Sequence, residues 1–331
     1  MVQTGHTVTV AFALNIAAGL ATVIGGGVIF SKHLVHLANP LSLAAALSVS
    51  AGVMLFVSFV EIFGKSVESF KLGIRTDDMS EDTAQGHGWL LATVFGAVGI
   101  SLIYLIDFVV AKISPAHEAI ELETVENLRE SIPQDSEYYV KSRDTPGDVI
   151  DLEGTGTTAS PSGTGLLMKM DDRSKRNLQQ MGVLTALAIG IHNIPEGIAT
   201  YVGAFQDSSV GFSLAVGIGL HNIPEGVAVA APIYFATGSR WRGLMWCVLS
   251  AIAEPLGGVI AWLAIGDGLG DISEGMLYGL VCGIMVCIVV KELLPTAFRF
   301  ARDQTHYVTL GMFFGMLIMV LSLTLFGYAG V

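Results

Sequence analysis

The amino-acid sequence predicts an all-α polytopic membrane protein with eight transmembrane helices. Hydrophobic residues make up 52% of the 331-residue chain and charged residues only 14%, whereas soluble domains carry about 25% charged residues. Apolar stretches long enough for a ~30 Å hydrocarbon layer also recur along the chain. This composition argues against a water-soluble enzyme. The net charge of -12 argues against a nucleic-acid partner, which requires a basic face.

The predicted spans form a group of three and a group of five. They cover residues 7–30, 39–63, 88–112, 178–203, 210–236, 242–264, 273–295 and 306–330. The first group belongs to residues 1–112 and the second to residues 178–331. Residues 113–177 between the groups are acidic and contain few large apolar side chains. Such a segment cannot bury enough surface to fold alone, so we expect a disordered cytosolic loop.

The basic residues predict the orientation of the chain. Of the 17 Lys and Arg, only Lys65, Lys71 and Arg75 lie outside the connections that follow the first, third, fifth and seventh helices. Because cytosolic loops are enriched in Lys and Arg, we expect those four connections in the cytosol and both termini outside it. We expect the plasma membrane as the location, with an internal membrane as the alternative.

One six-residue motif occurs twice and is central to the predicted function. His-Asn-Ile-Pro-Glu-Gly begins at His192 and again at His221. The loop between the two helices is short, so they run antiparallel and their motifs can meet at mid-membrane about an approximate two-fold axis. Within each copy the His and the Glu are four residues apart and share one helix face.

Three carboxylates are expected at similar depth in the membrane, namely Glu196, Glu225 and, in the next helix, Glu254. An ionised acid at the bilayer centre costs ~3 kcal/mol on the insertion scale, and no Lys or Arg lies near the middle of these segments. A purely structural role, in which Pro and Gly kink the helices and His and Asn cross-link them by hydrogen bonds, would explain a single buried His. It would not explain three buried acids. A divalent cation, or protonation, has to supply the missing positive charge.

The donor types narrow the choice of ion. Imidazoles and carboxylates without a thiolate suit Zn2+, Fe2+, Mn2+ or Co2+ better than Ca2+, Mg2+ or Cu(I). Both motif glutamates could bridge two ions, so the sequence is compatible with a binuclear site. One ion would bind His192, His221, Glu196 and Glu225, and the other would bind Asn193, Asn222, Glu196, Glu225 and Glu254.

These motifs resemble those of the ZIP zinc/iron permeases, particularly the ZupT/GufA-like branch. The resemblance rests on the two His-Asn-Ile-Pro-Glu-Gly copies, the stretch Ala253-Glu254-Pro255-Leu256-Gly257-Gly258 and the eight-helix pattern with a long loop after helix 3. It implies uptake of divalent transition metals toward the cytosol through a binuclear site with the ligands named above. Many ZIP proteins have a His-rich cytosolic loop, whereas His117 is the only histidine of this loop. That difference argues against a metal-sensing loop.

A second, weaker repeat relates helix 2 to helix 7. Gly52, Met54 and Glu61 coincide with Gly283, Met285 and Glu292 at an offset of 231 residues. The repeat predicts a 3+2+3 arrangement, in which helices 1–3 and 6–8 are inverted repeats around helices 4 and 5, an architecture typical of alternating access. Glu61 would lie near the outer mouth and Glu292 near the inner mouth. We interpret Met54 as a packed core residue in preference to a metal ligand.

The sequence therefore predicts a secondary transporter of divalent transition-metal ions, with Zn2+ as the expected substrate and Fe2+, Mn2+, Co2+ and Cd2+ as others. The ions and the lipid bilayer are the expected partners, and no prosthetic group is expected. The chain could also form a homodimer. An intramembrane zinc protease would use His-Glu-x-x-His, whereas this chain has His-Asn-x-x-Glu. A sensor that binds metal without moving it would keep the same ligands. No ATP-binding P-loop supports primary pumping.

Overall fold

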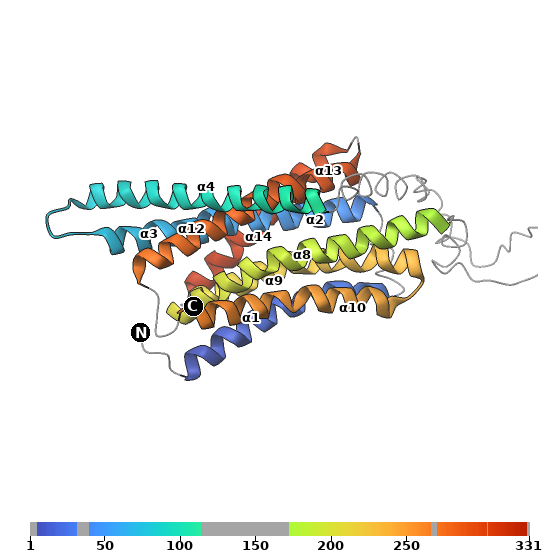
Figure 1. The fold of residues 1–331 in the computed structure, drawn as a ribbon, viewed down its shortest axis with the longest axis horizontal. Helices are drawn as coiled ribbons and strands as arrows, with labels where there is room; N and C mark the ends of the chain where they lie inside the picture. Colours follow the sequence, from blue (N-terminus) through green and yellow to red (C-terminus); the bar gives the residue numbers. More distant parts are fainter. Residues whose placement is uncertain (1–4, 32–39, 114–171, 266–269, 303, 330–331) are drawn as a thin grey trace, which may run out of the picture.

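The computed structural model describes residues 5–31, 40–113, 172–265, 270–302 and 304–329. The regular structure in these ranges is entirely helical, with no strand. Figure 1 shows the helices lying roughly along one direction in an elongated bundle. The helices are α1 Gly5–Gly26, α2 Pro40–Phe56, α3 Phe63–Ile74, α4 Glu81–Ile113, α8 Asp172–Gln206, α9 Ser208–Thr237, α10 Arg240–Ala251, α11 Ala253–Ile265, α12 Asp271–Ile288, α13 Leu294–Ala301 and α14 Thr305–Ala329.

Three short helical segments of other types continue these helices. A 3-10 turn, η1 Gly27–Phe30, follows α1. Two π-helical segments, η3 Val57–Ile62 and η4 Val289–Leu293, join α2 to α3 and α12 to α13. Short π-helical segments are rare and occur often at functional sites. Glu61 and Glu292, which the sequence aligns with each other, lie in these two segments.

Seven helical stretches of the described residues are long and apolar enough to cross a membrane, which confirms a multi-pass membrane protein. They are Gly5–Phe30, Leu41–Ile74, Glu81–Ile106, Ser208–Thr237, Arg240–Ala264, Asp271–Ala301 and Thr305–Leu325. Helix α8, 35 residues long, is not among them. It carries the same polar motif as α9, which is among the seven, but it also begins with a polar and charged stretch, residues 172–180.

Several helices extend beyond their predicted ends. The second stretch continues to Ile74, whereas residue 63 was expected, because α3 is amphipathic and buries Val67 and Phe70 despite its charged residues. The third begins at Glu81, where the carboxylate accepts a 2.8 Å hydrogen bond from the Lys71 ammonium. The fourth begins at Asp172, six residues early. The rest of the predicted loop, residues 114–171, lies outside the described residues.

The central pair of helices is antiparallel. Asp207 alone joins α8 to α9, and its carboxylate caps α9 by accepting a 2.9 Å hydrogen bond from the Ser209 amide. Helix α1 packs mainly on α9, and α11 packs mainly on α8. Helix α1 begins and α14 ends toward the end of the bundle at which α3 joins α4 (Figure 1).

Glycines permit the closest helix contacts around this pair. A Cβ atom added to Gly25 of α1 would collide with the Ile223 carbonyl of α9, and one on Gly257 of α11 would collide with the Ile194 carbonyl of α8. Ile223 is 29 residues after Ile194, the spacing of the two motifs. The α1–α9 and α11–α8 crossings therefore use equivalent residues, and at these positions only Gly fits.

The outer helices show the same correspondence. Gly52 of α2 faces the Met312 carbonyl of α14, whereas Gly283 of α12 faces the Gly96 carbonyl of α4. Gly283 is 231 residues after Gly52, which is the offset of the second sequence repeat. The α2–α14 and α12–α4 contacts are thus equivalent as well.

Candidate metal centre

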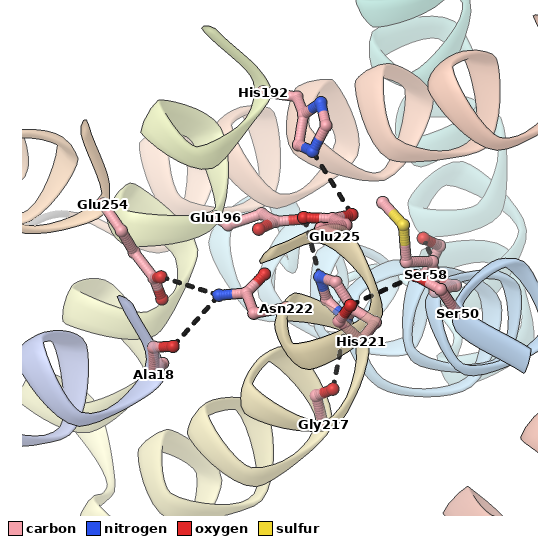
Figure 2. A network of polar contacts seen from close by, with 11 residues as sticks. Ala18, Ser50, Ser58, His192, Glu196, Gly217, His221, Asn222, Glu225 and Glu254 are labelled. Atoms are coloured by element: carbon pink, nitrogen blue, oxygen red, sulfur yellow. Dashed lines mark hydrogen bonds and ion pairs between the residues drawn. The ribbon is translucent and has the colours of Figure 1, made fainter. Parts of the chain in front are cut away.

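Both motif copies lie at the buried crossing of α8 and α9. His192, Glu196, His221 and Glu225 are at most 3% exposed. Pro195 and Pro224 lie inside helices that continue past them. Figure 2 shows the four side chains directed toward one another from the two helices. The structure therefore brings together the four residues assigned to the first ion.

Each imidazole faces the glutamate of the other helix, because the helices are antiparallel. The distance from His221 Nε2 to Glu196 Oε1 is 3.0 Å, and that from His192 Nε2 to Glu225 Oε1 is 3.4 Å. The His192 contact lacks hydrogen-bond geometry, since neither of its two atoms has a hydrogen-bond partner. The His221 pair is the tighter of the two (Figure 2).

The tautomer of His221 points to a cation at this position. His221 Nδ1 lies 3.1 Å from the Gly217 carbonyl, which can only accept a hydrogen bond, so we assign the ring proton to Nδ1. Nε2 then directs a lone pair at Glu196, another acceptor. Two acceptors at 3.0 Å need a proton or a metal ion between them, and the bond from Nδ1 orients the ring as in metal-bound histidines.

A second polar group lies beside this quartet and reaches α11. The Asn222 side-chain amide donates to Glu254 Oε2 at 3.0 Å and to the Ala18 carbonyl of α1 at 3.1 Å (Figure 2). These two donor bonds leave Asn222 Oδ1 without a hydrogen-bond partner. Gly19 of α1 lies near the same carboxylate, since an added Cβ would be 3.3 Å from Glu254 Oε2 and 2.9 Å from the Ala251 carbonyl. Asn222 and Glu254, both assigned to the second ion, are therefore together.

Unpartnered polar atoms are concentrated in this region. They include both amide atoms of Asn193 and one carboxylate oxygen each of Glu196 and Glu254. Leaving such an atom buried without a partner costs about 1–3 kcal/mol, so a cluster of them indicates a ligand. In the described part of the chain, no group of three or more His, Cys, Asp or Glu converges closely enough to hold a metal ion without rearrangement. The donor types nevertheless fit Zn2+ and similar ions.

Comparison with known proteins decides the family. The model of the ZIP Zinc transporter family matches residues 7–323. The chain belongs to the ZIP family. It is 36% identical over 323 residues to a protein named zinc transporter ZupT from Clostridium perfringens, and 97% of each chain is covered. A protein of that name from Chlorobaculum parvum is 38% identical over 317 residues, which are 96% of this chain and 97% of the relative.

Membership of the ZIP family confirms the resemblance inferred from the motifs. It also confirms a multi-pass membrane protein of a metal-ion transporter family. Because this family consists of transporters and not enzymes, the protease interpretation is excluded. The individual ligands and the ion remain predictions from the residues.

The other predicted residues of this ZIP chain flank the centre. Met54 of α2 is fully buried, and the Ser50 hydroxyl of the same helix donates to the His221 carbonyl at 3.4 Å. Glu61 is half-buried and accepts a 3.3 Å hydrogen bond from the Ser213 hydroxyl of α9. Glu292 is half-buried and within electrostatic range of His192.

Helix α1 is the element whose role the sequence reasoning missed. The Asn15 side-chain amide donates to the Gly197 carbonyl at 2.6 Å, and the backbone and Gly19 of α1 contact the Asn222–Glu254 pair. A signal was present, because Asn15, Gly19, Thr22 and Gly26 recur at helical spacing as a stripe of small and polar residues. In an otherwise apolar span, such a stripe indicates a face turned to other helices rather than to lipid.

Proposed function

We propose that this chain is a secondary transporter that carries divalent transition-metal ions, foremost Zn2+, into the cytosol. The observation that carries the proposal is the buried pair of cross-helix contacts, His221 with Glu196 and His192 with Glu225. A permanent structural role would favour replacing buried ionisable pairs by apolar side chains, which is often neutral or stabilising. Exchangeable metal ligands explain why they are present.

The site we propose is binuclear. The two imidazoles and the two motif glutamates hold the first ion, and the glutamates extend to the second, which also takes oxygens from Asn193, Asn222 and Glu254. In support, the quartet and the Asn222–Glu254 pair are neighbours, and the second oxygen of Glu196 has no hydrogen-bond partner. A bridging role would use that oxygen.

The architecture that goes with this function is a 3+2+3 arrangement of eight spans, with α8 as the eighth. The length of α8 and its packing between α9 and α11 support this count. The equivalent glycine contacts support inverted repeats related by an axis in the membrane plane. We place both termini outside and the acidic connection between α4 and α8 in the cytosol. We propose the plasma membrane as its location, with an internal membrane as the alternative.

The inverted repeats imply that Glu61 and Glu292 are exposed to opposite compartments. A cysteine in place of Glu61, in a chain without Cys247, Cys282 and Cys287, is expected to react with an impermeant thiol reagent added outside. A cysteine in place of Glu292 is expected to react only from the cytosolic side. Each should be wetted mainly in one conformation, and bound Zn2+ should slow both reactions. The readout is the fraction of chain modified in oriented vesicles.

The control for this experiment is a cysteine in place of Leu317, which is 50% exposed at the middle of α14 and should react from neither side. If both glutamate positions also resist the reagent from either side, the two carboxylates are packing groups rather than parts of a pathway. The two-mouth assignment would then be dropped.

Uptake into sealed vesicles tests the transport function itself. The purified chain in proteoliposomes is expected to accumulate Zn2+, with Cd2+, Fe2+, Mn2+ and Co2+ competing because the same His and carboxylate donors suit them. Ca2+ and Mg2+ should compete poorly, since they require oxygen ligands. Metal bound to the protein without accumulation inside the vesicles would indicate a sensor, the remaining alternative.

A further inference from the structure

Thr22 of α1 is a buried group that the proposed site does not use. It is fully buried, and its hydroxyl has no hydrogen-bond partner. Hydroxyls in membrane helices commonly bond to the carbonyl four residues earlier, as Thr93, Thr237 and Thr324 do here. The carbonyl that Thr22 would use, that of Ala18, accepts instead from the Asn222 amide. Thr22 has therefore been left free for another partner.

The internal correspondence of the fold shows which position Thr22 occupies. Gly226 of α9 lies against the Thr22 carbonyl, and Gly197 of α8 lies against the Glu254 carbonyl. Because Gly226 and Gly197 are equivalent motif positions, Thr22 of α1 is the counterpart of Glu254 of α11.

Two further hydrogen bonds agree with this assignment. The Asn15 amide of α1 donates to the Gly197 carbonyl at 2.6 Å, and the Cys247 thiol, seven residues before Glu254, donates to the Gly226 carbonyl at 3.3 Å. Asn15 is seven residues before Thr22. Both donors thus hold equivalent carbonyls from equivalent positions, and the correspondence between α1 and the α10–α11 segment extends over two helical turns.

The correspondence breaks at the side chains. Glu254 is long enough to reach Asn222, with 3.0 Å between carboxylate and amide. The counterpart of Asn222 is Asn193, which is fully buried and has no partner for either amide atom. The threonine hydroxyl is two bonds closer to the backbone than a glutamate carboxylate. Glu254 and Asn222 therefore contact each other directly, whereas their counterparts, Thr22 and Asn193, are buried without a hydrogen-bond partner.

We infer that Thr22 and Asn193 together hold a water ligand of the second metal ion, on the side opposite Glu254. A water needs two or more polar partners, and the ion with these two side chains supplies three. This inference rests on the proposed function, because it concerns the oxygen shell of the transported ion. Thr22 is then a positioning residue. The second site is neutral on the side of Thr22 and anionic on the side of Glu254.

The test is a calorimetric titration of the purified full-length chain with Zn2+. Thr22→Val keeps the side-chain shape and removes the hydroxyl, and we expect it to weaken the second binding event about tenfold, the low end of the effect of groups that support metal ligands. The first event should not change. Thr22→Ser, which keeps the hydroxyl and removes only the methyl group, should bind like the wild type.

Two further variants make the result decisive. Thr93→Val removes a hydroxyl bonded within its own helix, α4, which carries neither motif, and should leave both binding events unchanged. Thr22→Glu places a carboxylate opposite Glu254 and should tighten the second event. Equal binding by the wild type, Thr22→Val and Thr22→Glu would overturn the inference. Absence of Zn2+ binding by the wild type, or full binding by Glu225→Ala, would instead contradict the proposed function.

Discussion

Replacing Glu196 or Glu225 by Ala is expected to abolish uptake of every substrate metal. Each carboxylate faces an imidazole of the other helix and is proposed to bridge both ions, so either change damages two sites at once. Loss of a group that only supports a ligand costs about 10–100-fold, so loss of a bridging ligand should reduce Zn2+ uptake by at least ~100-fold. The measurement is initial Zn2+ uptake into proteoliposomes with equal amounts of folded protein.

Two controls accompany this prediction. Glu68→Ala removes an exposed acid of α3 and should transport normally. Glu254→Ala should be milder than either motif variant, because it leaves the His–Glu quartet intact and removes a ligand of the second ion only. Substantial uptake by Glu196→Ala or Glu225→Ala would refute the bridging role.

Gly197→Ala and Gly226→Ala are expected to destabilise the fold strongly. A Cβ at either position would collide with a backbone carbonyl, that of Glu254 or Thr22. Relief requires the helices to separate, and overpacking of this kind typically costs about 1–3 kcal/mol. The loss should appear as a lower thermal unfolding midpoint in detergent, together with weaker metal binding, since both contacts adjoin the centre.

Gly86→Ala of α4 is the matched control, because nothing lies within 4 Å of its added Cβ. Alanine is a better helix former than glycine by about 1 kcal/mol, so this variant should be as stable as the wild type or more so. If all three variants unfold at the same temperature, the close helix crossings are not what holds α8 and α9 in place.

The meeting of the two motifs could be predicted from the sequence because it follows from local patterns. His192 and His221 begin identical motifs on consecutive helices, and a short connection forces these helices to be antiparallel. The structure accordingly brings each histidine against the glutamate of the opposite motif. The alignment of Glu61 with Glu292 could also be found in sequence, and both residues lie in π-helical segments.

The contributions of α1 and α3 could not be predicted in the same way. Whether Thr22 or Asn15 faces the centre depends on the rotation of α1 against α9, which the Gly25 and Gly226 contacts fix only in three dimensions. Hydropathy likewise ended the second span at residue 63, because α3 carries Lys65 and Glu68. Its buried face is completed by α4, the next helix, and by α12, which is distant in sequence.

The most direct test of the metal centre is the anomalous X-ray scattering of crystals of the chain loaded with Zn2+ or Cd2+. The proposal predicts two anomalous peaks between α8 and α9. One should lie about 2.0–2.2 Å from imidazole nitrogens and carboxylate oxygens of the quartet, and the other beside Asn222 and Glu254. Metal bound only elsewhere, with the His221–Glu196 contact unchanged at 3.0 Å, would contradict a metal centre at this crossing.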